Sequence, residues 1–448
     1  MVVPSVPQEE WKTGEKILFR LAFIYFFIQC VPLDWKYYRE IFSIQWSHLQ
    51  YGDIFNLAHY APRFFEGPQQ SYLNWLVVLL IAVIGTVIWT IVDRSRTKEY
   101  SVLYYWLRVI VRYRLAIGLI AFGIIKLFPV QAPYPSLSNL NTPYGDFTRW
   151  KLFSLSLGIV PSYESFLGLV ETLFGVLLLY RKTASIGAFL ILIFTGNVFM
   201  SNLAYEGGES VYCLYLISLA LFLLLYDLRR IISLLVLQAP TAPSTFRPLF
   251  AAAWLKKARL PLKILLVLFF VGLYGFKTGA DYAKEPYRFP VTKGLQGVSG
   301  LYNVAVFSRN GDTLAYSKTD PVRWQDVVFE KWNTISIRSN RPVIIDSNNL
   351  EKLEPQDAAR NYELEGSIGR HYYSYTVDTV NHLLTLHNKS RHYSSETLTL
   401  HYTLGKDQLV LSGRDEKQTP VYAVLNRLNK KYLIQEAARQ GRRGRLKL

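Results

Sequence analysis

"RYRLAIGLIAFGIIKLFP", residues 112–129, is apolar for most of its length and carries a lysine, Lys126, near its end. A bilayer core of roughly 30 Å needs about 20 helical residues, so the stretch predicts most of a membrane-spanning helix. A charged side chain at the bilayer centre costs roughly 2.5–3.5 kcal/mol on insertion scales. The stretch therefore predicts a helical membrane protein in which Lys126 needs either a polar partner or access to the membrane surface.

Six further apolar stretches flank this one. Together they predict seven spans, at about residues 17–33, 73–92, 107–128, 164–180, 183–203, 211–228 and 260–277. Half of all residues are hydrophobic and the mean hydropathy is +0.13, and most of the apolar runs precede residue 280. The first span has no small-residue cleavage site in "CVPLDW", so we expect an uncleaved anchor.

The Lys and Arg residues of the connections predict the orientation. With the N-terminus in the cytoplasm, eighteen of them lie inside, and five lie outside: Lys36, Arg39, Arg63, Arg149 and Lys151. This asymmetry explains much of the net charge of +17 without nucleic acid as a partner. We therefore expect a multi-pass protein of the cell membrane, with the lipid bilayer as its first partner and the C-terminal domain outside.

Two outer loops have structure of their own. The stretch "LDWKYYREIFSIQWSHLQ", residues 33–50, indicates a helix in the membrane interface or one packed on the bundle, because five side chains share roughly one helical face: Trp35, Tyr38, Ile41, Phe42 and Leu49. "FPVQAPYPSLSNLNTPYGDF", residues 128–147, is rich in Pro, Ser and Asn and predicts an ordered but irregular external loop.

Polar residues in three successive spans approach the same depth. Lys126 lies near the outer end of its span, and Glu171 lies in the outer third of the next span. In the third span Asn197 lies at a similar depth, with Asn202 closer to the outer surface. Intramembrane ionisable groups usually pair or face a cavity. Lys126 has three interpretations: snorkelling to the interface, pairing with Glu171 with Asn197 supplying hydrogen bonds, or a ligand or proton site. Glu171 has two, a structural partner and a functional residue.

These residues also carry a family resemblance. "RLAIGLIAFGIIKLF", "GLVETLFGVLLLYRKTASIGAFLILIF" and the final apolar span resemble the four-helix core of the DoxX-like family, over about residues 107–228. The matching positions are Gly123 with Lys126, Glu171, Gly175, and Arg181 with Lys182. Because the family includes a subunit of a thiosulfate:quinone oxidoreductase, the resemblance permits quinone-linked redox chemistry, with quinone as the cofactor it would involve. The spans contain no haem-ligand pattern, CxxC or His pair.

The two cysteines, Cys30 and Cys213, both fall at outer ends of predicted spans. An oxidising outer face permits a disulfide between them, whereas two separate buried thiols are the alternative. Five histidines between residues 371 and 401 have no known metal-ligand spacing, so we predict ordinary strand histidines and no metal site.

The C-terminal part changes in composition. Asn310-Gly311 between alternating apolar residues is a strong hairpin signal, and further short alternating strands predict an antiparallel β-sandwich or small barrel. "PVRWQDVVFEKW", residues 321–332, favours a helix. We expect a transmembrane helical domain at 1–280 with its core at 107–228, an extracytoplasmic β-domain at 285–430, and a basic disordered tail at 431–448.

Three functions remain open at this point. The first is a redox-associated or quinone-interacting membrane subunit with an outward β-domain. The second is a non-catalytic binding or assembly protein that recruits a protein partner through that domain, and the third is a small-molecule transporter that uses the layer around Glu171. The sequence contains no catalytic constellation, which favours a subunit or binding role over a self-sufficient enzyme.

Overall fold

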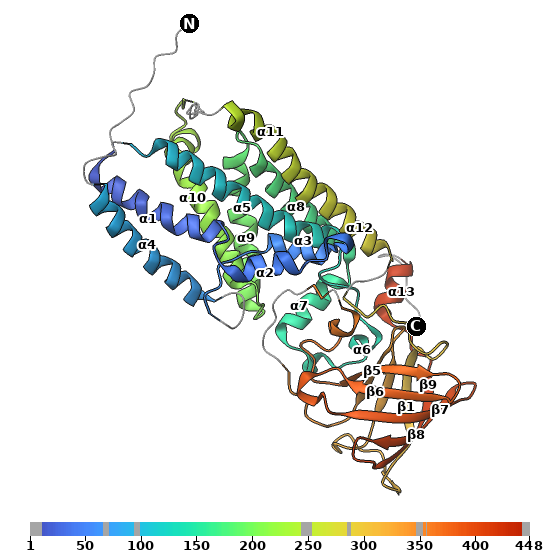
Figure 1. Ribbon diagram of the computed structural model, residues 1–448. Coiled ribbons are helices and arrows are strands. Elements are labelled where there is room, and N and C mark those ends of the chain that lie inside the picture. Colours follow the sequence, from blue (N-terminus) through green and yellow to red (C-terminus); the bar gives the residue numbers. More distant parts are fainter. Residues whose placement is uncertain are drawn as a thin grey trace. The chain divides into compact units, whose positions relative to one another are not determined.

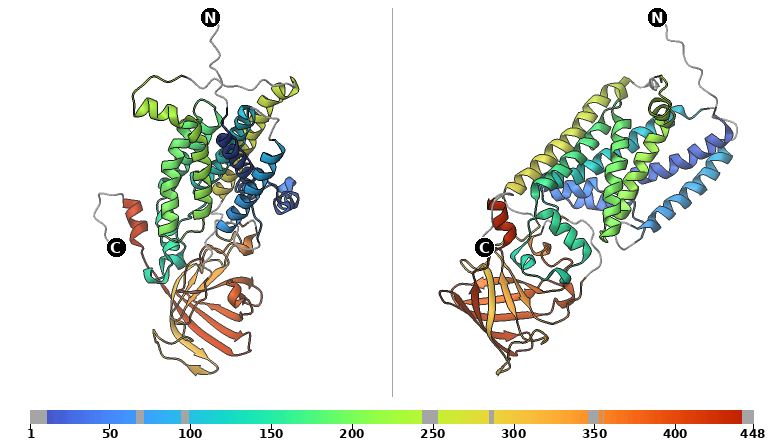
Figure 2. Two further views of the ribbon diagram at one scale, coloured as in Figure 1. Left: turned by 90° about the vertical axis from the view of Figure 1, so that its left-hand side faces the viewer. Right: turned by 180° about the vertical axis from the view of Figure 1, so that it is seen from behind.

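The computed structural model describes residues 11–65, 71–93, 99–242, 253–284, 288–345, 353–354 and 356–440. The chain forms two compact units, which can be followed in Figures 1 and 2. The helical unit comprises residues 1–128 and 165–280, and the β unit comprises residues 129–164 and 281–448. The predicted fold class, a helical membrane bundle followed by an antiparallel β-domain, is confirmed.

Each predicted span corresponds to a long helical segment. These segments are α1 (Thr13–Cys30), α4 (Tyr72–Val92), α5 (Ser101–Leu127), α8 (Pro161–Leu179), α9 (Ala184–Ala204), α10 (Ser210–Leu235), and α11 (Ala253–Val267), which continues through the π-helix Leu268–Leu273 into α12 (Tyr274–Lys284). Within the described residues, six of these segments are long and apolar enough to cross a membrane. The exception is α5, which has 27 residues but also carries Arg108, Arg112, Arg114 and Lys126.

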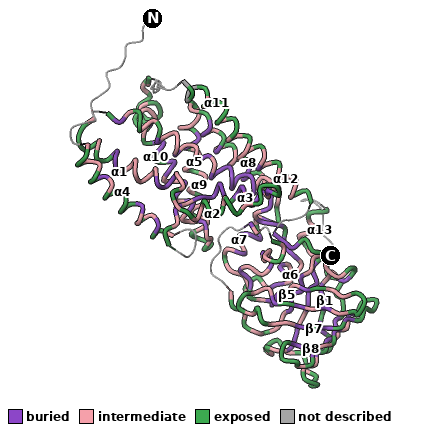
Figure 3. Tube along the Cα trace, in the orientation of Figure 1, coloured by how far each residue is buried: buried purple, intermediate pink, exposed green. Residues whose placement is uncertain are grey.

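The burial pattern explains why the most highly charged span is α5. Every residue from Gly118 to Ile125 is buried, so α5 lies inside the helical unit (Figure 3). By contrast, only 17% of the most apolar 18-residue stretch of α4 is buried. In the α11–α12 segment the corresponding share is 6%. The helices with the fewest protein contacts therefore offer their apolar side chains to lipid, while the charges of α5 find partners inside the protein.

The segment between α1 and α4 contains three short helices, α2 (Trp35–Ser43), the 3-10 turn Trp46–His48, and α3 (Tyr51–Ala58). The carboxylate of Asp34 accepts a hydrogen bond from the backbone N–H of Tyr37 at 2.8 Å and so caps α2. Trp35 and Phe42 of α2 are 70% and 74% exposed, as expected of an interfacial helix. The sequence analysis missed α3, which is almost wholly buried and packs against α5.

The β unit is built on a closed, eight-stranded antiparallel barrel. Its strands are β1 (Gly300–Arg309), β3 (Asp326–Phe329), β4 (Thr334–Arg338), β5 (His371–Asp378), β6 (Leu383–Asn388), β7 (Thr397–Leu404), β8 (Gln408–Asp415) and β9 (Pro420–Leu428). Neighbouring strands follow chain order, and β1 pairs with both β3 and β9, which closes the barrel. Apolar side chains from all eight strands form one buried core, so the barrel interior is packed.

Two local predictions in the barrel had opposite outcomes. Asn310 and Gly311 have φ angles of 56° and 89° and connect β1 to the two-residue strand β2 (Asp312–Thr313), which confirms the hairpin. The predicted helix at 321–332 is wrong, because this segment contains β3. Pairing with β1 and β4 places Val327 and Phe329 in the barrel core, and this burial outweighs any local helical preference.

The predicted external loop belongs to the β unit. Its helices are α6 (Leu137–Leu140), the 3-10 turn Tyr144–Asp146, and α7 (Arg149–Gly158). The backbone N–H of Thr148 donates to the carbonyl of Gly366, and that of Ile368 donates to the carbonyl of Asp146, both at 2.9 Å. Residues 129–164 are therefore an ordered wall of the barrel unit rather than an irregular loop.

The predicted disordered tail is only partly described. Residues 433–440, which fall within it, form the helix α13 (Leu433–Gln440). Arg439 of this helix contacts Glu436 one turn earlier at 3.2 Å, an i,i+3 pair of the kind that supports short helices. Residues 441–448, which hold most of the basic charge of the tail, lie outside the described residues.

Candidate functional site

The helical unit contains an ion pair between Lys126 and Glu171, which is one of the three interpretations that the sequence left open for Lys126. The Nζ atom of Lys126 donates to Oε2 of Glu171 at 2.7 Å, and the two side chains are 13% and 6% exposed. Lys126 lies in the last turn of α5, whereas Glu171 lies in the middle of α8. The ammonium group of Lys126 is thus directed at a carboxylate within the bundle, although Asn197 is not part of the pair.

Glycines allow α5 and α8 to come close enough for this pair. A Cβ atom added to Gly123 would lie 2.7 Å from the backbone nitrogen of Thr172, the residue after Glu171. A Cβ added to Gly168 would overlap the backbone of α5 around Lys126 and Leu127. Small residues at such crossings let helix backbones approach within membranes. The G-x-x-K pattern of α5 therefore has a geometric role, which is to set the distance at which Lys126 meets Glu171.

A second buried polar pair, between His59 and Glu209, lies nearby and was not predicted. His59, at the C-terminal end of α3, approaches Oε2 of Glu209 at 3.2 Å through its Nε2 atom. The His59 ring also contacts the rings of Tyr212 and Phe122, with centroids 4.2 and 5.1 Å away. On the other side, Nζ of Lys126 lies 5.7 Å from the Phe122 centroid. The ring of Phe122 thus lies between the Lys126–Glu171 ion pair and the His59–Glu209 pair.

We refer to Lys126, Glu171, His59, Glu209 and Tyr212 as the polar layer. Lys126 lies where α5 ends, and Glu209 and Tyr212 lie where α10 begins. Glu171 and His59 belong to the same layer because they contact Lys126 and Glu209. Tyr212 connects the polar layer to Tyr215 in the interior of the bundle, because the centroids of the two rings lie 5.5 Å apart. The polar layer is therefore continuous with the interior of the bundle through the contacting, mutually tilted rings of Tyr212 and Tyr215.

The deeper contact is centred on Arg114 of α5. Its Nε donates to the hydroxyl of Tyr215 at 3.2 Å, and its Nη2 donates to the carbonyl of Tyr60, which follows α3. The Tyr215 hydroxyl in turn donates to the carbonyl of Gln29 at 2.9 Å. Arg114 therefore holds the chain after α3 inside the bundle, which places His59 in the polar layer.

The other predicted site residues have different positions. Asn202 lies beside the polar layer, where its Oδ1 accepts a hydrogen bond from the backbone N–H of Glu209 at 3.2 Å, and its Nδ2 lies 4.0 Å from Sγ of Cys213. Asn197, expected to hydrogen-bond the Lys126–Glu171 pair, is instead exposed, because its position on α9 faces away from the buried side of that helix. Cys30 and Cys213 are both buried and both free thiols.

His59 and Glu209 were not predicted because their sequence context gives little sign that they are buried. His59 and Glu209 lie in connections that hydropathy assigns to the aqueous side, and their pairing depends on the insertion of α3 into the bundle. The one available signal is the apolar run "DIFNLA" just before His59, which is more hydrophobic than a solvent-exposed loop requires.

The polar layer has the chemistry of a proton-exchanging or ligand-orienting site. It brings two carboxylates, an ammonium group, an imidazole and a phenol together in a low-dielectric environment. There, hydrogen bonds to charged groups are stronger than in water, and ionisable residues within membranes commonly form proton relays. The aromatic rings of Phe122 and Tyr212 add flat apolar surfaces on which a planar ligand can stack.

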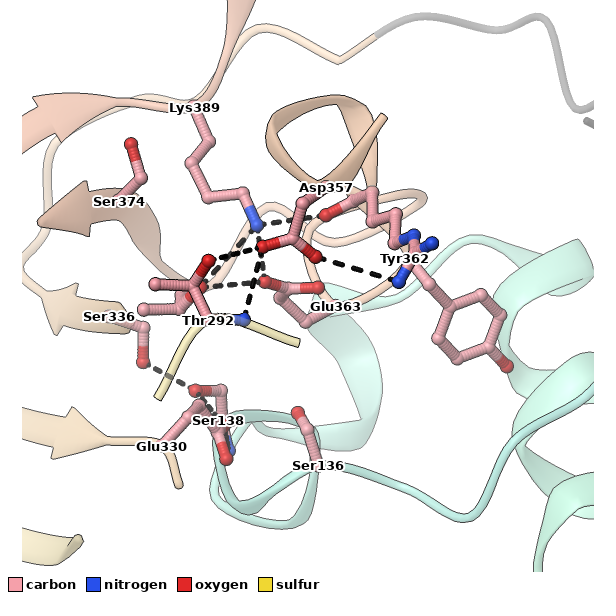
Figure 4. Close-up of polar contacts among 12 residues, drawn as sticks. Ser136, Ser138, Thr292, Glu330, Ser336, Asp357, Tyr362, Glu363, Ser374 and Lys389 are labelled. Carbon is pink, nitrogen blue, oxygen red and sulfur yellow. Dashed lines mark hydrogen bonds and ion pairs between the residues drawn. The ribbon is translucent and has the colours of Figure 1, made fainter. Parts of the chain in front are cut away.

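The β unit holds a separate buried polar cluster, shown in Figure 4. Glu330, which follows β3, accepts hydrogen bonds from the backbone N–H and the hydroxyl of Ser138 at 2.7 and 2.6 Å. Lys389 donates to Glu363 at 2.6 Å, with both side chains almost fully buried. These contacts fasten the segment 129–164 and the segment before β5 to the outside of the barrel wall.

Burial shifts several pKa values in this unit. Desolvation lowers the pKa of Lys151 to about 7, against the attraction of Glu365 and Glu363. Desolvation likewise raises the pKa of Glu330, despite its hydrogen bonds from Ser138. The pKa of His371 is lowered to about 4, first by burial and then by repulsion from Arg341.

The predicted strand histidines are solvated with one exception. His382, His387, His392 and His401 are exposed, whereas His371 at the start of β5 is buried. Across the described ranges, no group of three or more His, Cys, Asp or Glu side chains could hold a metal ion.

Comparison with known proteins adds no relative. The chain was compared with protein-family models, with curated proteins and with solved structures, and none of these comparisons gives a match.

Proposed function

We propose that the helical unit binds a quinone head group at the polar layer and that the protein acts as a redox-associated membrane subunit. The observation that carries this proposal is the buried Lys126–Glu171 ion pair beside the ring of Phe122. A charged pair inside a membrane bundle is expensive to maintain and usually marks a pathway or a ligand site. The resemblance to DoxX-like proteins supports the same class of ligand.

The side chains present suit a quinone in three respects. The ammonium of Lys126 and the imidazole of His59 are hydrogen-bond donors for carbonyl oxygens. The carboxyl groups of Glu171 and Glu209 contact these two donors and hold them in place. The rings of Phe122 and Tyr212, 5.6 Å apart, provide aromatic surfaces for a planar head group. Electrons would come from a partner subunit, so this chain supplies binding and proton exchange.

The proposed topology follows from the distribution of Lys and Arg. The N-terminus lies in the cytoplasm, the polar layer lies near the outer leaflet, and the β unit lies outside the cell membrane. A quinone diffusing in the bilayer would then reach the polar layer laterally, without crossing an aqueous phase.

Quinone retention by the purified full-length protein tests the proposal. Organic extracts of the wild type are expected to contain quinone, measured by its absorbance, and Glu171→Gln and His59→Gln should lose most of it. Asn197→Ala and His48→Gln are matched controls, because Asn197 and His48 are both exposed. Equal quinone content in the controls and in both polar-layer variants, or a wild type that binds no added quinone, would contradict the proposal.

A second candidate function is partner binding through the β unit. It is favoured by a cavity of about 250 Å³ whose lining includes Trp150 of α7, His371, Lys389 and the exposed His392. Nε2 of His371 makes no hydrogen bond to any of the described residues although it is buried, so a donor or acceptor from a bound group would satisfy it.

Affinity capture with the full chain tests this second function. A specific partner retained by the wild type should be lost in His392→Ala, whereas His401→Ala, an exposed histidine outside the cavity lining, should retain it. Capture that both variants preserve would argue against this cavity as the binding site.

A further inference from the structure

A basic cavity lies at the opposite end of the helical unit from the polar layer. It has a volume of about 40 Å³, and its charged lining consists of Arg108 and Arg112 of α5 and Arg181 of the turn between α8 and α9. One water molecule needs about 10–15 Å³ by the same kind of measure, so the cavity accommodates more than a single water. Ser185 of α9 adds a hydroxyl group to the lining.

The acidic group nearest to this cavity is already engaged. Asp227 of α10 accepts hydrogen bonds from Oγ of Ser185 at 2.5 Å and from Nη1 of Arg230 at 2.7 Å. Arg108 reaches Asp227 only at 3.9 Å and stacks instead on the ring of Tyr226, 3.3 Å from its centroid. Asp227 is therefore shared among Ser185, Arg230 and Arg108. Among the described residues that line the cavity there are three arginines and no carboxylate.

The arginines of α5 also retain unused donors. In the described part of the chain, the buried Nε atoms of Arg108 and Arg112 have no hydrogen-bond partner. Lys263 of α11 adds a further cation to this end of the unit, since its Nζ lies 5.9 Å from the ring of Tyr180, the residue before Arg181. Buried guanidinium donors without acceptors indicate a site for an anion with several oxygen atoms.

We propose that this cavity binds a phosphate group, and specifically that of an anionic phospholipid head group. Guanidinium groups match the geometry of phosphate oxygens with paired hydrogen bonds. At 1.5 Å per residue, Arg108 and Arg112 lie about 1.5 and 7.5 Å from the inner end of the predicted span 107–128, a depth that lipid head groups and the adjoining interface can reach. Basic pockets between membrane helices on the cytoplasmic side bind such head groups, and the Lys and Arg asymmetry assigns this end to the cytoplasm.

Native mass spectrometry of the full-length protein in detergent tests the proposal. Phosphatidylglycerol is titrated against phosphatidylcholine, and the wild type should bind phosphatidylglycerol in preference. Arg112→Gln and Arg181→Gln should each weaken this binding by about tenfold or more, the loss expected when a charge-assisted hydrogen bond is removed. Arg229→Gln is the matched control, because Arg229 of α10 is exposed and does not line the cavity.

Competition with inorganic phosphate and a charge-conserving variant complete the test. Inorganic phosphate that displaces the lipid at similar concentration would show that the site takes phosphate from either source, whereas displacement only by lipid would establish the head group as the ligand. Arg112→Lys keeps the charge and serves if Arg112→Gln does not fold. Equal binding of both lipids, or equal loss in Arg229→Gln and the cavity variants, would overturn the proposal.

Discussion

Separate and combined replacement of Lys126 and Glu171 gives the sharpest test of the polar layer. The atoms are 2.7 Å apart, and neither side chain is more than 13% exposed. Removing one partner of a buried pair typically costs about 3–5 kcal/mol, whereas hydrogen bonds between membrane helices average about 0.6 kcal/mol and reach about 1.7. We therefore expect each single variant, Lys126→Met or Glu171→Gln, to lose about 2–3 kcal/mol of unfolding free energy.

The two single variants should not be equally destabilised. Lys126 lies in the last turn of α5, so in Glu171→Gln its ammonium can extend toward the interface. Glu171 lies in the middle of α8 and has no such route in Lys126→Met. Lys126→Met should therefore be the more destabilised variant.

Equilibrium unfolding in mixed micelles at neutral pH measures these differences. The double variant should recover about 1–2 kcal/mol relative to the sum of the singles, since contacting residues couple in this range. Asn197→Ala, on the exposed side of α9, should change stability little. Strictly additive losses in the double variant would refute direct pairing.

Three further predictions concern packing and pH. Gly168→Ala should separate α5 from α8 and destabilise the bundle by about 1–3 kcal/mol, as overpacking does in other cores, whereas Gly196→Ala, with open space around it, should not; thermal unfolding compares them. Burial lowers the pKa of Lys151 in the folded protein to about 7, whereas its pKa in the unfolded chain is about 10.4. Between these two pH values the unfolded state binds one more proton than the folded state. The free energy of unfolding should therefore rise by about 1.4 kcal/mol per pH unit from about pH 7 to about pH 10.4. Lys151→Met should abolish this slope in denaturant titrations at a series of pH values, and an unchanged slope would exclude Lys151 as its source. Burial also lowers the pKa of His371 in the folded protein to about 4, whereas its pKa in the unfolded chain is about 6.5. The free energy of unfolding should therefore fall as the pH is lowered from about 6.5 to about 4, because the unfolded state binds the proton first. Acid unfolding of His371→Gln should lack this component, and a profile identical to the wild type would contradict the assignment.

The sequence predicts those features of the fold that depend on local chemistry. The seven spans follow from runs of apolar residues, and the hairpin at Asn310-Gly311 follows from residues that tolerate positive φ angles. The sequence offered the Lys126–Glu171 pair as one of three interpretations, because a cation near a helix end can pair at similar depth or snorkel to the interface.

Features that depend on long-range packing were not predictable in this way. The assignment of residues 129–164 to the β unit rests on contacts such as those of Ser138 with Glu330, almost two hundred residues apart. The position of His59 depends on the insertion of α3 and on the hydrogen bond from Arg114 to the carbonyl of Tyr60. Hydropathy places both segments in aqueous loops, since it cannot register the tertiary partners that bury them.

Labelling with a photoreactive quinone tests the central claim most directly. The full-length protein in lipid membranes is illuminated with the probe, digested and mapped by mass spectrometry, with unlabelled quinone as competitor. The account predicts competed labels on the peptides that hold Phe122 with Lys126 and Tyr212. Labels confined to the lipid-facing residues of α4 and α11, or labelling that competitor does not reduce, would contradict the claim that quinone binds at the polar layer.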